Sequence, residues 1–221
     1  MLRSEFHADL QKLQDDLMNL GSMVEKATIK AIDALKTRDL VLSQKIIEED
    51  DVIDDIRYEI EARCEDLIAK QQPLATDLRL IIAIMHIVGE LERIGDYAEG
   101  VAKISLAMGD EAPLKPLIDI PRMAQKASLM TRQSLDALVQ RDVDLAITVA
   151  ESDDEVDALY DQIFRELVTF MIEDPRTIQR ATYLLWVAHD LERIADRATN
   201  IAERVVYLVT GELSKLKEIF P

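Results

Sequence analysis

The sequence has few of the residues that interrupt or cross-link a chain. Its 221 residues include six Gly, six Pro and a single Cys, Cys64. One Cys excludes an intrachain disulfide, and the apolar neighbours of Cys64 predict a small buried side chain. Aromatic residues make up only 5%, while apolar residues make up 48% and charged residues 31%. This composition is typical of an ordered, helix-rich protein and not of a disordered one.

The sequence is also short of positive charge. Lys and Arg number 26 against 43 Asp and Glu, so the formal net charge is −17. The basic footprint of a nucleic-acid-binding protein is absent, and we expect no nucleic-acid partner. A polybasic patch for an anionic membrane surface is absent as well. The charge favours cations and partners with basic surfaces.

Long apolar runs are missing. The longest, residues 80–89, is too short to span a bilayer and contains His86. The first ten residues include Glu5, His7 and Asp9 and lack the apolar segment of a signal peptide. We therefore expect a soluble, cytoplasmic protein without membrane insertion.

The sequence contains an internal repeat. The segment Leu91-Glu92-Arg93-Ile94-Gly95-Asp96 returns 100 residues later as Leu191-Glu192-Arg193-Ile194-Ala195-Asp196. An upstream Asp-rich segment, Asp50-Asp51-x-x-Asp54, returns 103 residues later as Asp153-Asp154-x-x-Asp157. Two matched segments in the same order predict a tandem duplication of about half the chain.

Apolar residues recur at helical spacing along both halves, and no alternating strand pattern competes with them. Asp39 and Asp174 suit the N-caps of helices, and Gly211 suits the residue that follows a helix. The pattern predicts three long helices in each half, over residues 2–36, 39–70, 73–108, 121–140, 142–172 and 174–210.

Short turns between long helices place consecutive helices antiparallel. We therefore predict an all-α fold of two tandem up-down-up three-helix bundles. The first repeat covers residues 1–110, the linker 111–120 and the second repeat 121–221. We expect the single tryptophan, Trp186, to lie in the core.

The repeated motif places carboxylates on one helix face. Because a helix turns about 100° per residue, Glu92, Asp96 and Glu99 form one stripe. Glu192 and Asp196 repeat its first two members in the second half. Like charges at this spacing destabilise a helix unless something offsets them. The motif therefore predicts a cation site in each half.

The Asp-rich segments lie at the right height to complete these sites. Asp51 is 12 residues after Asp39, and Asp96 is 12 residues before Met108, so both lie at one level in an antiparallel pair. Oxygen ligands without sulfur suit Mg²⁺, Ca²⁺, Mn²⁺ or iron better than a structural zinc. The candidate metal ligands are Glu92, Asp96, Glu99, Glu192, Asp196, Asp51, Asp54, Asp154 and Asp157.

Taken together, these motifs resemble the PhoU family of regulators of bacterial phosphate uptake, over essentially the whole chain. The first half carries Gln72-Pro73-x-x-x-Asp77-Leu78-Arg79 and then the first copy of the repeated motif. The second half carries Asp174-Pro175-Arg176, the second copy, and Asn200-Ile201-Ala202-Glu203.

The resemblance implies two three-helix bundles with metal-binding E(D)xxxD motifs, here Glu92/Asp96 and Glu192/Asp196. It implies bound metal ions, with iron, manganese, magnesium and zinc as the candidates. It further implies a cytoplasmic negative regulator of the phosphate regulon, which is not an enzyme. The implied partners are the ATP-binding subunit of the phosphate ABC transporter, the phosphate sensor histidine kinase and a second copy of the chain in a homodimer.

Two other interpretations stay open on the sequence. A carboxylate-bridged di-metal oxidase uses a Glu-x-x-His motif on two helices, whereas this chain has the reverse order, His189-x-x-Glu192. A metal-free scaffold is the second alternative, because Arg193 and Asp196 are also spaced for an ordinary intrahelical ion pair.

Overall fold

The protein is built from helices over residues 2–212, which are the residues that the computed structural model describes. A 3₁₀ turn, η1 (Pro175–Thr177), precedes the last helix. The predicted all-α fold of two three-helix repeats is confirmed, although residues 213–221 of the second repeat lie outside the described residues. The helices are α1 (Leu2–Thr37), α2 (Leu40–Gln71), α3 (Ala75–Met108), α4 (Asp119–Gln140), α5 (Val143–Glu173) and α6 (Ile178–Thr210).

Equivalent side chains start the middle helix of each repeat. The carboxylate of Asp39 accepts a hydrogen bond from the backbone N–H of Leu42 at 2.9 Å. The carboxylate of Asp142 accepts one from Leu145 at 3.0 Å. Each bond satisfies a backbone donor that has no partner within the helix. The two caps are 103 residues apart, so the duplication extends to the start of α2 and α5.

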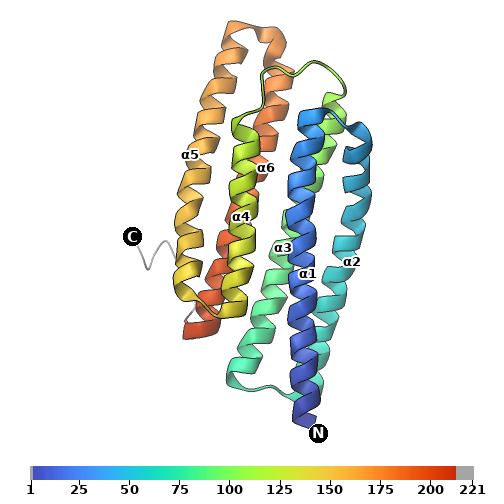
Figure 1. Ribbon diagram of the computed structural model, residues 1–221, viewed down its shortest axis with the longest axis vertical. Helices are drawn as coiled ribbons and strands as arrows, with labels where there is room; N and C mark the ends of the chain where they lie inside the picture. Colours follow the sequence, from blue (N-terminus) through green and yellow to red (C-terminus); the bar gives the residue numbers. More distant parts are fainter. Residues whose placement is uncertain (1, 213–221) are drawn as a thin grey trace.

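The two bundles lie side by side (Figure 1). The linker runs across one end of the molecule from α3 to α4, so the second repeat descends beside the first. As a result α3 packs against α6, and α1 packs against α4, each pair being antiparallel. The α2 and α5 helices lie on the two outer sides.

The repeats share one hydrophobic core. Buried apolar side chains from all six helices form a single contact cluster. Close contact between α1 and α4 depends on Gly21, because a Cβ there would clash with Cδ1 of the buried Leu135. Cys64 is fully buried, as its neighbours predict, and burial raises its pKa to about 12.

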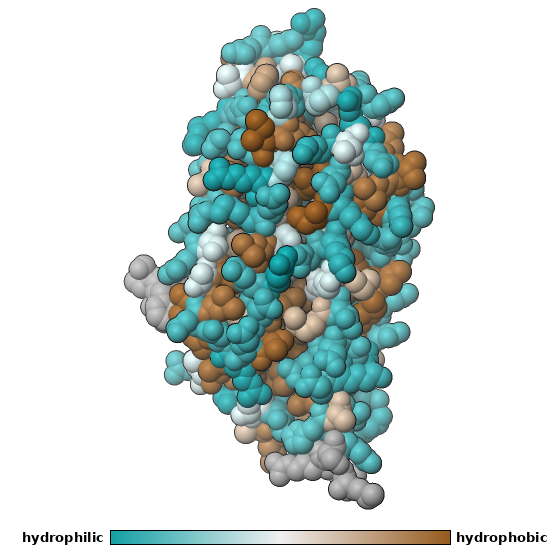
Figure 2. Space-filling model, in the orientation of Figure 1, coloured by the Kyte–Doolittle hydropathy of each residue, from teal (hydrophilic) through white to brown (hydrophobic). Residues whose placement is uncertain are grey.

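The prediction that Trp186 lies in the core is wrong. The buried face of α6 passes through Leu184, Val187 and Leu191, and Trp186 points away from it with 53% of its surface exposed. The face shown in Figure 2, over α1, α4 and α5, is mostly hydrophilic with apolar side chains scattered through it. None of the helices in residues 2–212 contains a segment with the length and apolar character of a membrane span.

Candidate functional site

Three carboxylates of α2 and α3 meet in the first repeat. Asp54 on α2 and Glu92 and Asp96 on α3 each place an oxygen within 4.8 Å of the others. Glu92 and Asp96 are one helical turn apart, and the antiparallel α2 brings Asp54 to their level. We call these three residues the α2–α3 carboxylate group.

A fourth carboxylate, Asp50, lies beside this group. A Cβ on Gly95 would lie 3.0 Å from Oδ1 of Asp50 and 3.2 Å from a methyl carbon of Ile53. Gly95 therefore allows α2 to approach α3 closely at this level. The pKa of Asp50 is raised to about 7, first by burial and then by the charges of nearby carboxylates, Glu99 before Asp96.

Burial and mutual repulsion also act on the α2–α3 carboxylate group itself. Burial and the charge of Asp96 raise the pKa of Glu92, and burial and the charge of Asp54 raise that of Asp96. The guanidinium of Arg57 opposes this at 3.9 Å from Glu92. Within residues 2–212, the buried Oδ1 of Asp54 has no hydrogen-bond partner. The group thus concentrates negative charge, which nearby positive side chains such as Arg57 offset only in part.

Two predicted ligands in the first half are placed differently. Asp51 is exposed and does not belong to the carboxylate group. The reason is rotational, because Asp51 is about 160° around α2 from the buried Ile53, whereas Asp50 is about 60° from it. A comparison of the rotations of Asp50 and Asp51 from Ile53 would have selected Asp50 from the sequence alone. Glu99 lies near Asp50 but pairs with Lys103 at 2.5 Å.

The second repeat arranges its acidic residues differently. Glu192 lies 3.3 Å from His189 and 3.2 Å from Arg193, and Arg193 lies 2.9 Å from Asp196. The predicted ion pair of Arg193 and Asp196 is therefore present. A positive side chain thus occupies the space between the two motif carboxylates.

The Asp-rich segment of α5 also differs from its copy in α2. Asp154 and Asp157 are exposed, whereas Asp153 is buried and is the counterpart of Asp50. Within residues 2–212, no group of three converging metal-ligating side chains forms in the second repeat. The two halves of the duplication therefore place the same motif in unequal surroundings.

The α2–α3 carboxylate group has the chemistry of a cation site. Its donors are all carboxylate oxygens, which hard cations such as Mg²⁺ and Mn²⁺ prefer and which iron also accepts. A cation would offset the repulsion that raises the pKa values and would give the buried oxygen of Asp54 a partner. The residues present therefore fit a metal ion.

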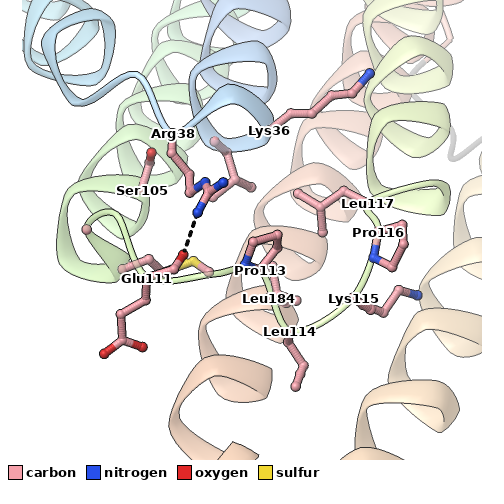
Figure 3. A pocket seen from close by; sticks show the side chains of 13 residues that line it. Lys36, Arg38, Ser105, Glu111, Pro113, Leu114, Lys115, Pro116, Leu117 and Leu184 are labelled. Atoms are coloured by element: carbon pink, nitrogen blue, oxygen red, sulfur yellow. Dashed lines mark hydrogen bonds between the residues drawn. The ribbon is translucent and has the colours of Figure 1, made fainter.

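A separate cavity lies under the linker (Figure 3). It has a volume of about 270 Å³ and is lined largely by apolar side chains such as Leu35, Leu114 and Leu184. Arg38 donates hydrogen bonds to the backbone carbonyl oxygens of Asp110 at 3.3 Å and Glu111 at 3.2 Å and so holds the linker in place. Lys36, Arg38, Glu111 and Lys115 also line the cavity, and Figure 3 shows that their charged ends do not meet at one point.

Comparison with known proteins gives one consistent match. The model of the PhoU domain matches residues 17–105 and 120–205, one match in each half of the chain. A protein of Clostridium acetobutylicum named phosphate-specific transport system accessory protein PhoU homolog is 41% identical over 99% of this chain and 100% of its own length.

Solved structures agree with this match. The crystal structure of PhoU from Pseudomonas aeruginosa is 40% identical, covers 94% of this chain and 100% of its own, and superimposes with a TM-score of 0.89. The phosphate transport system regulatory protein PhoU from Streptococcus pneumoniae is 32% identical, covers 95% and 99% of the two chains, and has a TM-score of 0.88. The chain therefore belongs to the PhoU family.

Proposed function

We propose that this protein is an accessory protein of a phosphate transport system and acts as a cytoplasmic negative regulator of the phosphate regulon. In this role it links the ATP-binding subunit of the transporter to the sensor histidine kinase. Similarity over nearly the whole chain to a protein named as a phosphate-specific transport accessory protein carries the proposal. The net charge of −17 is suited to partners with basic surfaces.

Pull-down with purified components tests the adaptor role. The transporter's ATP-binding subunit and the cytoplasmic part of the kinase are each immobilised and offered the full chain under high phosphate. We expect retention by both. Retention by neither would exclude the adaptor role, and an unrelated acidic protein of similar charge controls for non-specific ionic binding.

We further propose that the α2–α3 carboxylate group binds a metal ion. Asp54, Glu92 and Asp96 would hold it, and iron, manganese, magnesium and zinc are the candidates. The clustered oxygens and the buried, unpartnered Oδ1 of Asp54 support this within residues 2–212. The metal would supply positive charge between α2 and α3. The protein side chains would orient around it and hold the two helices in register, which gives partners a defined surface.

Metal analysis of protein purified without chelator tests this part. The variant to compare neutralises the motif carboxylates in both repeats: Glu92→Gln, Asp96→Asn, Glu192→Gln and Asp196→Asn. Asp51→Asn is the matched control, because it removes one negative charge from an exposed position of α2 outside the group. We expect the control to retain its metal and the quadruple variant to lose it. Equal metal in wild type and quadruple variant would exclude the assigned site.

We do not propose an enzymatic activity. In the di-metal oxidase alternative, the ligands project into the bundle interior. Here His189 is 48% exposed and lies against Glu192 and Tyr160 at the surface. The homodimer that the resemblance implies remains part of the proposal, and sedimentation velocity over a range of concentrations would test it.

A further inference from the structure

The seam where α3 packs against α6 contains two related carboxylates, one from each repeat (Figure 1). Glu90 on α3 and Asp190 on α6 are 100 residues apart and occupy equivalent positions of the duplication. Oε2 of Glu90 lies 3.3 Å from Nη1 of Arg197 and 3.0 Å from Nδ2 of Asn200, both on α6. If the two repeats are exchanged, the same arrangement places Asp190 opposite positions 97 and 100 of α3.

Asp190 lies in that equivalent place, but α3 offers it no cation. A Cβ on Gly100 would lie 3.0 Å from Oδ2 of Asp190, so the carboxylate faces α3 at the expected level. Tyr97 stands at the position equivalent to Arg197, and Gly100 at the position equivalent to Asn200. Within residues 2–212, Asp190 makes no hydrogen bond and no ion pair. The seam therefore supplies a cation to one carboxylate and none to its counterpart.

An unpaired carboxylate is unfavourable in this position. Asp190 is only partly accessible to water, and a carboxylate taken out of water needs a cation or hydrogen bonds in compensation. The cations one turn away along the helices are engaged elsewhere, since Lys103 pairs with Glu99, and Arg193 with carboxylates of its own helix. Gly100 leaves the carboxylate open, because any larger residue there would place its Cβ against Oδ2.

Aromatic and apolar side chains surround this carboxylate. Trp186 lies one turn before Asp190 on the same side of α6 and is 53% exposed. Because position 100 faces Asp190 and the helices are antiparallel, Ile104 on α3 lies level with Trp186. Tyr97 lies level with the next turn of α6, and it packs partly buried against the core, as Ile104 does. We call Trp186, Asp190, Tyr97, Gly100 and Ile104 the Asp190 socket.

The equivalent surface on the other half of the seam is completed by the chain itself. His86 and Arg204 stand at the positions equivalent to Trp186 and Ile104. Burial and the charge of Arg204 lower the pKa of His86, so these two side chains are neighbours across the same seam. The acid of that half thus lies among nitrogen donors of α6, whereas the place that Arg197 fills there is open at the Asp190 socket.

We infer that the Asp190 socket receives an arginine side chain of a partner protein. The partner's guanidinium takes at Asp190 the place that Arg197 takes at Glu90. A guanidinium fits better than an ammonium, because it binds a carboxylate through two parallel hydrogen bonds and stacks on aromatic rings such as Trp186. The inference rests on the adaptor function proposed above and assigns one of its contacts to the α3–α6 seam.

The test measures binding of the full chain to the transporter's ATP-binding subunit and to the cytoplasmic part of the kinase. The variant is Asp190→Asn, which keeps the shape of the side chain and removes its charge. The measurement is made at pH 8, where the wild-type carboxylate is mostly ionised, because burial raises its pKa to about 7. We expect at least one dissociation constant to rise about tenfold or more, as for the loss of a hydrogen bond between charged groups. The control Asp51→Asn removes a charge from an exposed position of α2 and should leave both constants within about twofold.

A second variant fills the socket and leaves Asp190 in place. Tyr97→Arg puts a guanidinium at the position equivalent to Arg197, from which it pairs with Asp190 within the chain. We expect it to bind the same partner as weakly as Asp190→Asn does. Tyr97→Gln changes the same position without supplying a cation and should bind more tightly than Tyr97→Arg. Urea unfolding of each variant controls for loss of the fold.

The arginine is identified from the partner's side. Ile104 is replaced by the photo-crosslinking residue p-benzoylphenylalanine, and the crosslinked peptide of the partner is located by mass spectrometry. We expect that peptide to contain an arginine. Changing this arginine of the partner to glutamate should abolish binding to the wild type, and Asp190→Arg in this chain should restore part of it.

Each outcome has a defined meaning. If the wild type binds a partner and both Asp190→Asn and Tyr97→Arg bind it equally well, the inference is overturned while the adaptor function stands. If the wild type binds neither partner, the adaptor function itself fails, and the inference falls with it. A crosslinked peptide without arginine, or loss of a homodimer in Asp190→Asn, would assign the socket to another occupant and also overturn the inference.

Discussion

Asp54→Asn should change the stability of the protein in opposite directions with and without a metal ion. In the α2–α3 carboxylate group, oxygens of Asp54, Glu92 and Asp96 lie within 4.8 Å of one another. Two unit charges at this separation repel by about 1 kcal/mol in water and by about 3 kcal/mol at an effective dielectric constant of about 20. The lower value is appropriate here, because Asp96 is exposed and water screens it.

The substitution removes the repulsion of Asp54 with both neighbours. In the presence of a chelator, we therefore expect the free energy of unfolding to rise by about 1–2 kcal/mol. A metal ion at 100 times its dissociation constant stabilises the wild type by about 2.7 kcal/mol. Because a neutral amide is a poorer metal ligand than the carboxylate that it replaces, we expect the variant to lose most of this gain. The wild type should then be the more stable protein.

Urea unfolding followed by far-ultraviolet circular dichroism measures both effects, once with EDTA and once with Mn²⁺. Asp51→Asn is the control, and its stability should stay within about 0.5 kcal/mol of wild type in both conditions, as is usual at exposed positions. A variant less stable than wild type in EDTA would refute the repulsion argument. A variant that gains as much from Mn²⁺ as wild type would refute the role of Asp54 as a ligand.

Three further predictions concern packing, a buried acid and the thiol. Gly21→Ala should lower the free energy of unfolding in urea by about 1–3 kcal/mol, because the added Cβ meets Leu135. A second substitution, Leu135→Ala, should relieve this clash. Additive effects of the two substitutions in a double-mutant cycle would contradict the explanation. Burial raises the pKa of Asp190 to about 7, well above the usual range of an aspartate, so in EDTA the wild type should lose stability from about pH 4 to pH 7. The free energy of unfolding of Asp190→Asn should therefore exceed that of wild type by about 2–4 kcal/mol at pH 8 and should not exceed it at pH 4. An equal difference at both pH values would exclude the raised pKa of Asp190 as its cause. Cys64 is fully buried and its pKa is raised to about 12, so Ellman's reagent should react with it only after unfolding.

The helices and their ends were largely predictable because their causes are local. Apolar spacing predicts each helix to within a few residues, and Asp39 caps α2 as its residue type suggests. The expected start of the sixth helix differs slightly, since residues after Asp174 first form a 3₁₀ turn. The stacking of Glu92 and Asp96 likewise follows from helical periodicity within one segment.

The candidate site was predictable only in part because it joins two helices. Counting residues along α2 and α3 correctly predicted that the Asp-rich segment lies level with Glu92 and Asp96. Height along the helix alone cannot distinguish Asp50 from Asp51. The choice depends on which side of α2 faces α3, and Gly95 decides how closely the helices approach. In the second repeat, the contacts of Arg193 with Glu192 and Asp196 set the surroundings of an otherwise similar motif.

The sequence by itself determined the all-α class, the duplication and the acidic stripes, since periodicity and repetition are properties of the chain. Tertiary structure decided that the repeats lie side by side on one shared core, because the helix faces that pair are chosen by packing between distant segments. It also decided that Trp186 is exposed, because Leu184, Val187 and Leu191 already fill the inner face of α6.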